Sequence, residues 1–223
     1  MREFIDLGVN PQEGSLESII ETAKQLGYNR IGVEGNKKSD RLDLVNRVDL
    51  RPRNQNELGK QLRKLRYKAE VIIVHCNTRS VSRQAARDHR VDFCRFPISG
   101  GKRMQYLDRR QAGLMRDSGA GYEVCIQDMY VDDRVQLIKR IGIIKKSLGI
   151  ALKNDLPVIA SSGASDVYGI RDPHGLASLL SLLGVDEELA LNMVSSVPNA
   201  VIEENRAKLS PNFIEPGVWI IDE

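Results

Sequence analysis

The sequence predicts an α/β fold: a distorted or incomplete (β/α) TIM-like barrel with extra C-terminal helices. Short runs of β-branched residues alternate with amphipathic helical patterns along most of the 223 residues, which is typical of βαβ units. The run at residues 71–74 is apolar at every position, as expected for a parallel strand whose sheet is covered by helices. A single (β/α) barrel commonly has about 250 residues, so we expect one barrel domain over residues 1–223.

Seven strands are expected in the inner layer. A complete barrel has eight strands, so seven indicate an incomplete one. An open doubly wound sheet is the alternative, because periodicity alone does not separate the two architectures well. The expected strands cover residues 4–9, 30–33, 47–51, 71–76, 91–96, 122–126 and 157–161.

The helix expected after the first strand has an apolar face that includes Leu16, Ile19 and Ala23. Ser15 is predicted to cap this helix, and Gly27 to end it in a left-handed turn. The longest helix is expected to carry its apolar stripe on Val131, Val135, Ile138 and Ile141.

The last third of the chain is predicted to be almost entirely helical. Three helical patterns cover residues 173–183, 186–195 and 198–206, with little strand pattern between them. Asp172 precedes Pro173, which is typical of an N-cap followed by proline in the first turn of a helix.

Two observations concern cellular location. No apolar run approaches the roughly 20 residues that cross a bilayer, and the strand pattern beginning at Phe4 leaves no room for a signal peptide. Cys76, Cys94 and Cys125 are odd in number and widely spaced, and they follow or lie within apolar runs. We interpret them as buried free thiols of a cytoplasmic protein rather than as metal ligands.

Positive charge is concentrated in the middle of the chain. Residues 51–116 contain 17 Lys and Arg against 5 Asp and Glu, whereas residues 1–50 contain 7 against 9 and residues 117–223 contain 9 against 16. Clustered Lys and Arg repel one another unless an anion neutralises them, so this segregation predicts a surface that binds a polyanion. Arginine outnumbers lysine here, which suits phosphate oxygens.

Three successive helices are predicted to present this charge, over residues 56–68, 80–90 and 104–116. In the second, four arginines fall within a narrow arc, and Asp88 is expected to point away from them. Exposed rings for base stacking are few, so we expect contacts to the phosphates and the shape of a folded RNA. The residues expected to bind RNA are Arg51, Arg53, Lys60, Arg63, Lys64, Arg79, Arg83, Arg87, Arg90, Lys102, Arg103, Arg109 and Arg110.

Catalytic candidates are sparse. No zinc motif, nucleophile elbow, phosphate loop or dinucleotide fingerprint is present among the three histidines and the glycine-containing turns. The small residues 161–165 are interpreted either as a backbone anion site or as a tight turn without a ligand. The polar residues expected on or near strand ends are Asp6, Asp49, Arg51, His75, Arg95 and Glu123.

These strand-end residues allow two interpretations. Two carboxylates and an imidazole could hold a divalent metal, or the buried polar groups could satisfy one another inside the barrel. We favour the second interpretation, and therefore expect no catalytic residue and no metal ligand on this chain.

Several segments together resemble a known family. The most specific are residues 157–164 (PVIASSGA) and 171–176 (RDPHGL), supported by 4–9 (FIDLGV), 71–76 (VIIVHC), 91–93 (VDF) and 182–184 (LLG). Over nearly its whole length the chain resembles protein component 3 of archaeal ribonuclease P, the counterpart of the eukaryotic thirty-kilodalton subunit.

The resemblance implies a (β/α) barrel within an endoribonuclease that removes the 5′ leader from precursor tRNA. It implies that the ribonuclease P RNA, with its Mg²⁺ ions, is the catalyst, and that this chain needs no cofactor. The implied partners are the ribonuclease P RNA and a smaller ribonuclease P protein subunit, with precursor tRNA as the substrate of the assembly. A neutral or acidic patch in the C-terminal half is expected to contact protein partners.

The family's barrel is similar to that of metal-dependent phosphoesterases that carry His-x-His on the first strand. Here that position is Asp6-Leu7-Gly8, so both histidines are missing. A stand-alone metal-dependent phosphoesterase using Asp6, Asp49, His75 and Glu123 is the alternative function, and a protein scaffold without RNA affinity is a third.

Overall fold

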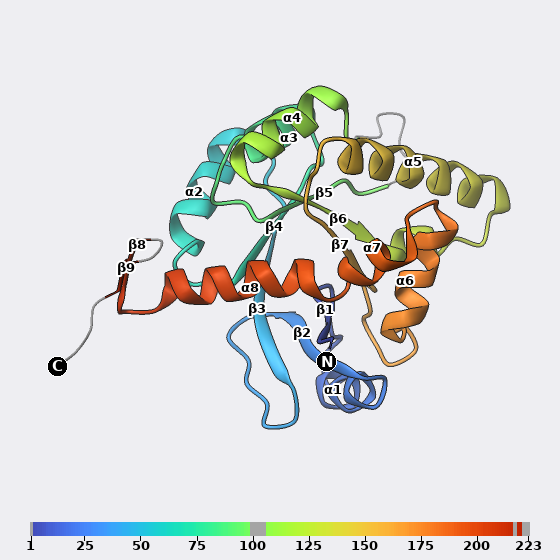
Figure 1. The fold of residues 1–223 in the computed structure, drawn as a ribbon, viewed down its shortest axis with the longest axis horizontal. Coiled ribbons are helices and arrows are strands. Elements are labelled where there is room, and N and C mark those ends of the chain that lie inside the picture. Colours follow the sequence, from blue (N-terminus) through green and yellow to red (C-terminus); the bar gives the residue numbers. More distant parts are fainter. Residues whose placement is uncertain (1, 99–105, 216–217, 220–223) are drawn as a thin grey trace.

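The computed structural model describes residues 2–98, 106–215 and 218–219, and Figure 1 shows its elements. Seven strands form one sheet in which each strand pairs in parallel with the next strand of the sequence. A doubly wound sheet would reverse its strand order at a switch point, so that alternative is wrong. The strands are β1 (Phe4–Asp6), β2 (Tyr28–Glu34), β3 (Asp43–Leu50), β4 (Val71–His75), β5 (Phe93–Arg95), β6 (Gly121–Cys125) and β7 (Val158–Ser161).

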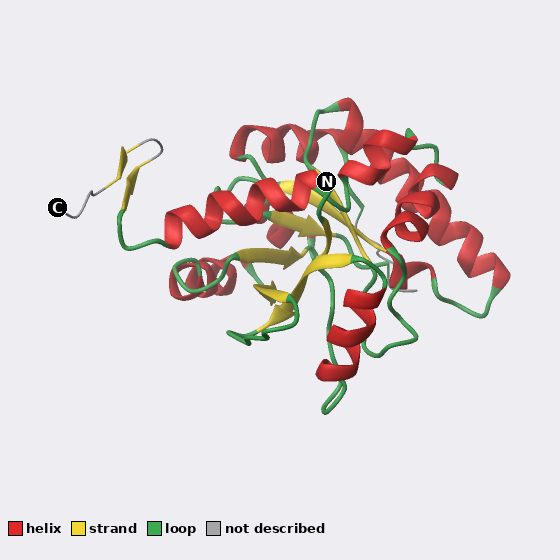
Figure 2. Ribbon diagram, turned by 60° about the horizontal axis from the view of Figure 1, so that its bottom comes forward, coloured by secondary structure: helices red, strands yellow, loops and turns green. Residues whose placement is uncertain are grey.

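Helices surround these strands, as the red ribbons around the yellow arrows in Figure 2 show. The nearly closed ring of seven strands with helices outside confirms the predicted incomplete barrel, including its additional C-terminal helices. An antiparallel pair, β8 (Phe213–Glu215) and β9 (Val218–Trp219), was not predicted. The helices are α1 (Leu16–Gln25), α2 (Gln55–Leu65), α3 (Arg79–Ala85), α4 (Arg109–Ser118), η1 (Ile126–Met129), α5 (Arg134–Lys153), α6 (Pro173–Leu182), α7 (Glu187–Asn192) and α8 (Ser196–Leu209).

The place of an eighth strand between β1 and β7 is taken by the segment that joins α7 to α8. The backbone N–H of Ile5 in β1 donates to the carbonyl of Val194 at 2.9 Å, and the N–H of Ala160 in β7 donates to the carbonyl of Met193 at 3.1 Å. These bonds satisfy strand edges that would otherwise be buried without partners. The ring is therefore closed by backbone that is not a strand.

The interior of the ring is apolar near the starts of the strands. Ile5, Val71 and Phe93 form one buried cluster with Ile202 of α8, which crosses the ring at this end (Figure 1). Side chains further along the same strands are polar, because every second residue of a strand points to the same side. This arrangement leaves a buried polar layer nearer the carboxyl ends of the strands.

Several local expectations can be compared with the structure. Gly27 has φ +91°, and Asp172 accepts a hydrogen bond from the N–H of Gly175, so the predicted turn and cap are confirmed. Ser15 does not cap α1 with its side chain, because its hydroxyl donates to the carbonyls of Gln12 and Ser165 instead. The three cysteines are buried and free.

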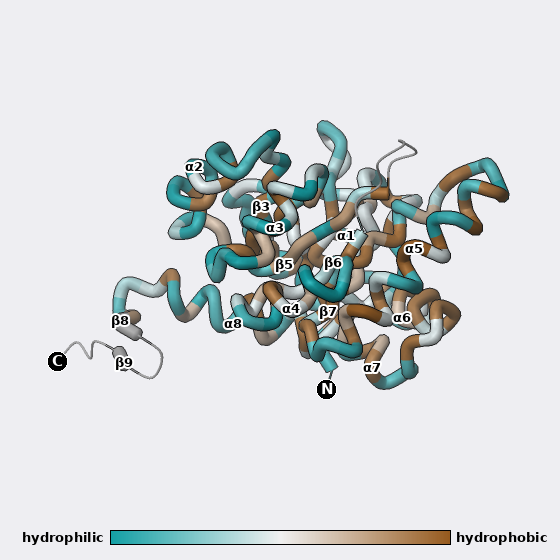
Figure 3. The backbone as a smooth tube through the Cα atoms, turned by 90° about the horizontal axis from the view of Figure 1, so that it is seen from above, coloured by the Kyte–Doolittle hydropathy of each residue, from teal (hydrophilic) through white to brown (hydrophobic). Residues whose placement is uncertain are grey.

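The predicted apolar stripe of the longest helix does not face the core. Val135 is 59% and Ile138 is 62% exposed, and the buried face of α5 is formed instead by residues that begin at Ile144. Hydrophobic colour recurs along α5 in Figure 3, including the end that projects from the body. Within the described part of the chain, no helix has both the length and the apolar character needed to cross a bilayer.

Candidate functional site

The predicted cationic surface lies on the outer faces of α2, α3 and α4, which pack beside one another in chain order (Figure 1). We call the exposed Lys and Arg on these helices and on their adjoining loops the basic flank. Nine predicted residues are exposed there, and within residues 2–98 and 106–215 none of the nine makes an ion pair. They are Arg51, Arg53, Lys60, Arg63, Lys64, Arg79, Arg87, Arg109 and Arg110.

Helix α2 shows how the sequence places this charge. The side chain of Asn54 accepts a hydrogen bond from the N–H of Glu57 at 3.0 Å and fixes where the helix begins. Leu58 and Leu62 then face the core with no exposed surface. Helical periodicity turns Lys60, Arg63 and Lys64 toward solvent.

Two predicted residues of the flank are not free. The Arg83 guanidinium lies 2.6 Å from a carboxylate oxygen of Asp108, and Arg90 binds both carboxylate oxygens of Asp88 at 2.8 and 2.7 Å. The prediction that Asp88 points away is therefore wrong. Helix α3 ends at Ala85, so the segment beyond it turns and brings Asp88 back to Arg90.

The Asp88–Arg90 pair has a clear electrostatic cause. Asp88 is a buried residue, and a buried carboxylate is costly unless a cation and hydrogen bonds neutralise it. The hydrogen bond from Arg90 lowers the pKa of Asp88 and raises the pKa of Arg90. Arg90 therefore neutralises a buried carboxylate and stabilises the fold.

Two further predicted residues, Lys102 and Arg103, lie outside the described residues.

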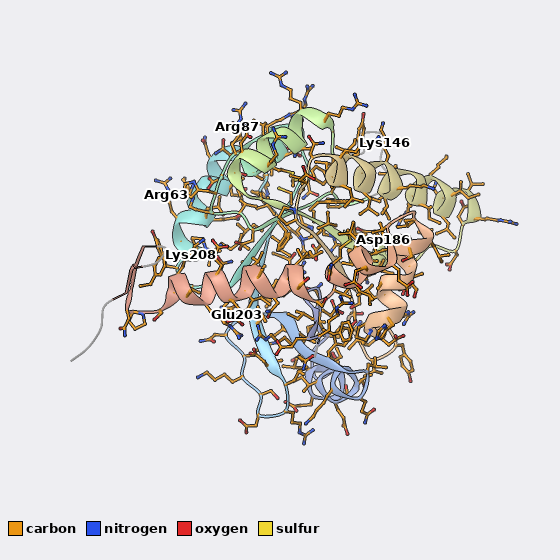
Figure 4. All side chains as sticks on the ribbon, viewed as in Figure 1. Arg63, Arg87, Lys146, Asp186, Glu203 and Lys208 are labelled. Atoms are coloured by element: carbon orange, nitrogen blue, oxygen red, sulfur yellow. The ribbon has the colours of Figure 1, made fainter. Side chains whose placement is uncertain are left out.

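Helix α5 adds cations that the sequence reasoning missed. Arg109 and the side chains of Lys145, Lys146 and Lys153 line a cavity of about 490 Å³, and the described residues of its lining include no carboxylate. The Lys146 ammonium lies 4.5 Å from the centre of the Tyr106 ring. Figure 4 shows Arg63, Arg87 and Lys146 in the upper part of the view, above Asp186 and Glu203. These lysines were missed because residues 117–223 are acidic overall. Their spacing of three to four residues along a helix is the signal that could have identified them.

Inside the barrel, one arginine organises the polar layer. Arg47 of β3 is 1% exposed. Its guanidinium donates to Asp49 at 2.8 Å, to Glu123 at 2.6 Å and to the carbonyl of Leu7 at 2.9 Å. The Ser161 hydroxyl donates to Glu123 at 2.7 Å. Glu123 is therefore bonded to Arg47 and Ser161, and Asp49 is bonded to Arg47 and His75.

The electrostatics of this layer follow from that geometry. Burial alone would raise the pKa of Asp49, but the Arg47 charge and the hydrogen bond with His75 outweigh it and hold this pKa far below its ordinary value. Burial would raise the pKa of Glu123 as well, but the charges of Arg47 and Arg95 outweigh burial and lower this pKa below its ordinary value. Both carboxylates are therefore held ionised by buried guanidinium groups.

The four residues of the metal hypothesis are not brought together as ligands. Arg47 lies between Asp49 and Glu123, and the Asp6 carboxylate accepts from the N–H groups of Gly8 and Ser162 instead. Among the described residues, no three His, Cys, Asp or Glu side chains are grouped as a metal would require. The favoured interpretation fits Asp49, His75 and Glu123, which are bonded to neighbouring polar groups, but one Asp6 carboxylate oxygen and the Arg95 Nε are buried without a hydrogen-bond partner among the described residues.

The remaining polar candidates and histidines do not form a catalytic group. Arg51 is exposed beyond the end of β3, and Arg95 reaches Asp128 at 3.1 Å. The His174 ring packs edge-on against Phe4, with 5.1 Å between the ring centres, and His89 lies exposed beyond α3.

The small-residue segment after β7 forms a tight turn. Gly163 has φ +77°, a conformation that L side chains rarely adopt. The N–H of Ser162 is bound to Asp6, and the N–H of Ala164 is bound to the Ser162 hydroxyl. These two donors are therefore used within the fold, which fits the interpretation as a tight turn rather than the alternative of an anion site.

The family model and two named relatives identify one family, and a solved structure shares the fold. The family model described as RNase P subunit p30 matches residues 3–210. The chain is 23% identical to ribonuclease P protein component 3 of Methanosarcina mazei over 236 residues, covering 99% of this chain and 96% of that protein. It is 27% identical to the protein of the same name from Methanococcus maripaludis strain C7 over 177 residues, covering 79% and 75%. A chain in the cryo-EM structure of archaeal ribonuclease P with mature tRNA shares the fold, with a TM-score of 0.84, 22% identity and 98% of both chains covered.

Proposed function

The chain belongs to the RNase P subunit p30 family, and we propose that within ribonuclease P it binds the RNA subunit through the basic flank and the adjoining lysines of α5. The observation that supports this proposal most strongly is the group of nine exposed cations without an ion pair in the described residues. An unpaired cation keeps its full charge for a phosphate, whereas a paired one must first give up its carboxylate. Guanidinium groups also match phosphate oxygens in a planar, two-pronged geometry.

We place the chemistry on the RNA subunit and its Mg²⁺ ions, with precursor tRNA as the substrate whose 5′ leader is removed. The buried Arg47 guanidinium, between Asp49 and Glu123, supports this assignment. A divalent cation entering the barrel would meet a fixed positive charge where it needs free carboxylates. The chain's contribution is to hold the RNA in its active fold. A cytoplasmic location stays a prediction.

The smaller protein subunit is proposed to dock on the side formed by the projecting end of α5 together with α6 and α7. Exposed apolar side chains gather on these elements: Val135, Ile138, Leu182 and Leu189. Asp186, Glu187 and Glu188 at the start of α7 provide the acidic character expected of this patch. We expect Ile138→Glu to prevent co-purification with the partner and to leave RNA binding unchanged, as measured by pull-down and by a filter-binding titration. Normal co-purification would place the partner elsewhere.

The central experiment compares charge reversal on two sides of the molecule. Arg63→Glu combined with Arg87→Glu should weaken binding of the ribonuclease P RNA and reduce leader cleavage in the reconstituted enzyme. Arg83 is left unchanged because its ion pair with Asp108 would confound the result. The matched control is Lys24→Glu combined with Lys38→Glu, two exposed residues without an ion pair in the described part of the chain, on α1 and on the loop between β2 and β3, which lie across the molecule from α2, α3 and α4 (Figure 1).

The control pair should bind and cleave as the unaltered protein does. Equal loss from both pairs would mean that only net charge matters, and no loss from either would remove the basic flank as the binding surface. Leader cleavage by the purified chain without the RNA subunit would contradict the assignment of the chemistry to RNA.

A further inference from the structure

A small pocket opens at the carboxyl ends of β6 and β7, apart from the basic flank. Its cavity of about 320 Å³ is lined by the loops that follow these two strands. Carboxyl ends of barrel strands are where loops build ligand sites in this architecture. The volume is at the lower end of the range for ligand pockets, about 300–1,000 Å³, so a single small ring system is the appropriate occupant. The residues that shape it are Gln127, Tyr130, Ser165, Asp166, Tyr168 and Arg171.

Two exposed aromatic rings flank the pocket. Tyr168 is 86% and Tyr130 is 46% exposed, although large rings are normally buried. The Arg171 guanidinium carbon lies 5.4 Å from the centre of the Tyr130 ring. Aromatic and guanidinium planes are the surfaces on which unpaired bases stack in protein–RNA complexes.

The loop that carries Tyr168 is held in place by hydrogen bonds from distant segments. The N–H groups of Asn10 and Gln12 donate to the carbonyls of Ala164 and Ser165, at 2.8 and 3.0 Å. The Tyr28 hydroxyl donates to the carbonyl of Arg171 at 2.8 Å. A site fixed in this way loses little conformational entropy when it binds.

The turn before Tyr168 is fixed as well. One oxygen of Asp166 accepts from the N–H groups of Tyr168 and Gly169, at 2.9 and 3.0 Å. The exposed Tyr168 ring is thus carried on an ordered backbone.

The polar groups around the pocket suit the edge of an uncharged ring. Asp166 supplies an acceptor, the Ser165 hydroxyl can donate or accept, and the Gln127 amide offers both. One carboxylate and one guanidinium give the pocket almost no net charge, in contrast with the basic flank. A phosphate would gain little here, whereas a nucleobase presents donors and acceptors around a flat face.

We propose that this pocket holds one unpaired base of the ribonuclease P RNA, stacked on Tyr168 and Tyr130, as a second contact that is independent of the phosphates bound by the basic flank. The inference rests on the proposed function, since it requires that the chain bind that RNA. It extends the proposed function by adding recognition of a base to the recognition of phosphates.

The test uses the full chain in the reconstituted ribonucleoprotein. A photo-crosslinking benzoylphenylalanine at position 168 identifies the nucleotide beside the pocket. RNA lacking the base at that nucleotide is then compared with intact RNA, for the unaltered protein, for Tyr168→Ala and for Tyr168→Phe. We expect Tyr168→Ala to weaken binding of intact RNA on the order of tenfold, the lower part of the range for base–aromatic stacking. The same change should have no effect on the abasic RNA, and Tyr168→Phe should bind both RNAs normally.

Equal losses of Tyr168→Ala on intact and abasic RNA, or no loss on either, would overturn the proposal. So would crosslinks from position 168 that go only to a protein subunit, because the pocket would then hold a side chain. The Arg63→Glu and Arg87→Glu variant is measured in parallel. If it loses binding while the Tyr168 comparison shows no effect, the base pocket is wrong and the proposed function stands. If neither alters RNA binding, both are wrong.

Discussion

Arginine is buried and ion-paired in the interior of the barrel, whereas on the outer helices it is exposed and largely unpaired. Arg47 is buried and bonded to Asp49, Glu123 and a backbone carbonyl, whereas Arg63 and Arg87 are exposed and free of any ion pair in the described residues. The buried guanidinium is committed to the fold, and the exposed ones are available to a ligand. This contrast is the basis of the proposal that ion pairing, rather than the number of positive charges, decides which arginines can bind RNA.

The side of the molecule away from the basic flank supports this conclusion. Arg30 there lies within 3.4 Å of Glu3, Asp43 and Glu203, and Arg206 binds Asp43 and Glu70. These two arginines are neutralised by neighbouring carboxylates. Figure 4 shows Glu203 well away from Arg63 and Arg87.

The largest expected effect comes from removing the buried cation. Arg47→Met should lower the free energy of unfolding by about 3–5 kcal/mol, because Asp49 and Glu123 are left buried without their counter-charge. Urea unfolding followed by circular dichroism measures this change. Arg51→Met, at an exposed position just beyond β3, is the control and should alter stability by no more than about 0.5 kcal/mol. Similar losses of unfolding free energy in both variants would contradict the distinction between buried, paired arginines and exposed, unpaired ones.

The same pair of carboxylates predicts a dependence of stability on pH. The pKa values of Asp49 and Glu123 are lowered in the folded protein. Their contribution is therefore fully present above the unfolded values of about 4, and it is lost as the pH falls from there toward the lowered values.

Glu123→Gln removes one of these titrating groups. The variant should be less stable than the unaltered protein at pH 7, and the difference between them should shrink as the pH falls below about 4. Unfolding midpoints between pH 7 and pH 3 give this comparison. A difference that stayed constant would mean that Glu123 is not held ionised by Arg47.

Neighbouring arginines offer a smaller and sharper contrast. Arg90→Gln removes the partner of the buried Asp88 and should cost about 1–3 kcal/mol of stability, with RNA affinity unchanged. Arg87→Gln should do the reverse, leaving stability within about 0.5 kcal/mol and weakening RNA binding. Thermal unfolding and RNA titration of the two variants separate the roles. An RNA-binding defect in Arg90→Gln equal to that of Arg87→Gln would remove the contrast.

The sequence predicts the strands well because each strand is encoded by its own apolar run. Exposure of α2 is predicted for a similar reason, since Leu58 and Leu62 fix which side faces the core. Ion pairs between helices are not encoded locally. The Arg83–Asp108 pair joins residues 25 positions apart, and it needs the packing of α3 beside α4.

Two parts of the candidate site escaped prediction because they depend on tertiary structure. The lysines of α5 join the cationic surface only because α5 packs beside α4. Tyr130 and Tyr168 come from separate loops, and the barrel brings them to one pocket. Arg47 is a strand residue whose partners come from strands on both sides of the ring, so its role could not be read from spacing.

The most direct test of the central claim is the salt dependence of binding to the ribonuclease P RNA. The variant with Arg63→Gln, Arg87→Gln and Lys146→Gln removes three cations that have no ion pair with any described residue. The variant with Arg2→Gln, Arg90→Gln and Lys208→Gln removes three paired cations. If unpaired cations neutralise phosphates, the first variant should flatten the slope of log affinity against log salt by about 0.9 for each duplex phosphate that is no longer neutralised. The second variant should keep the slope of the unaltered protein. Identical slopes for the two variants would contradict the claim.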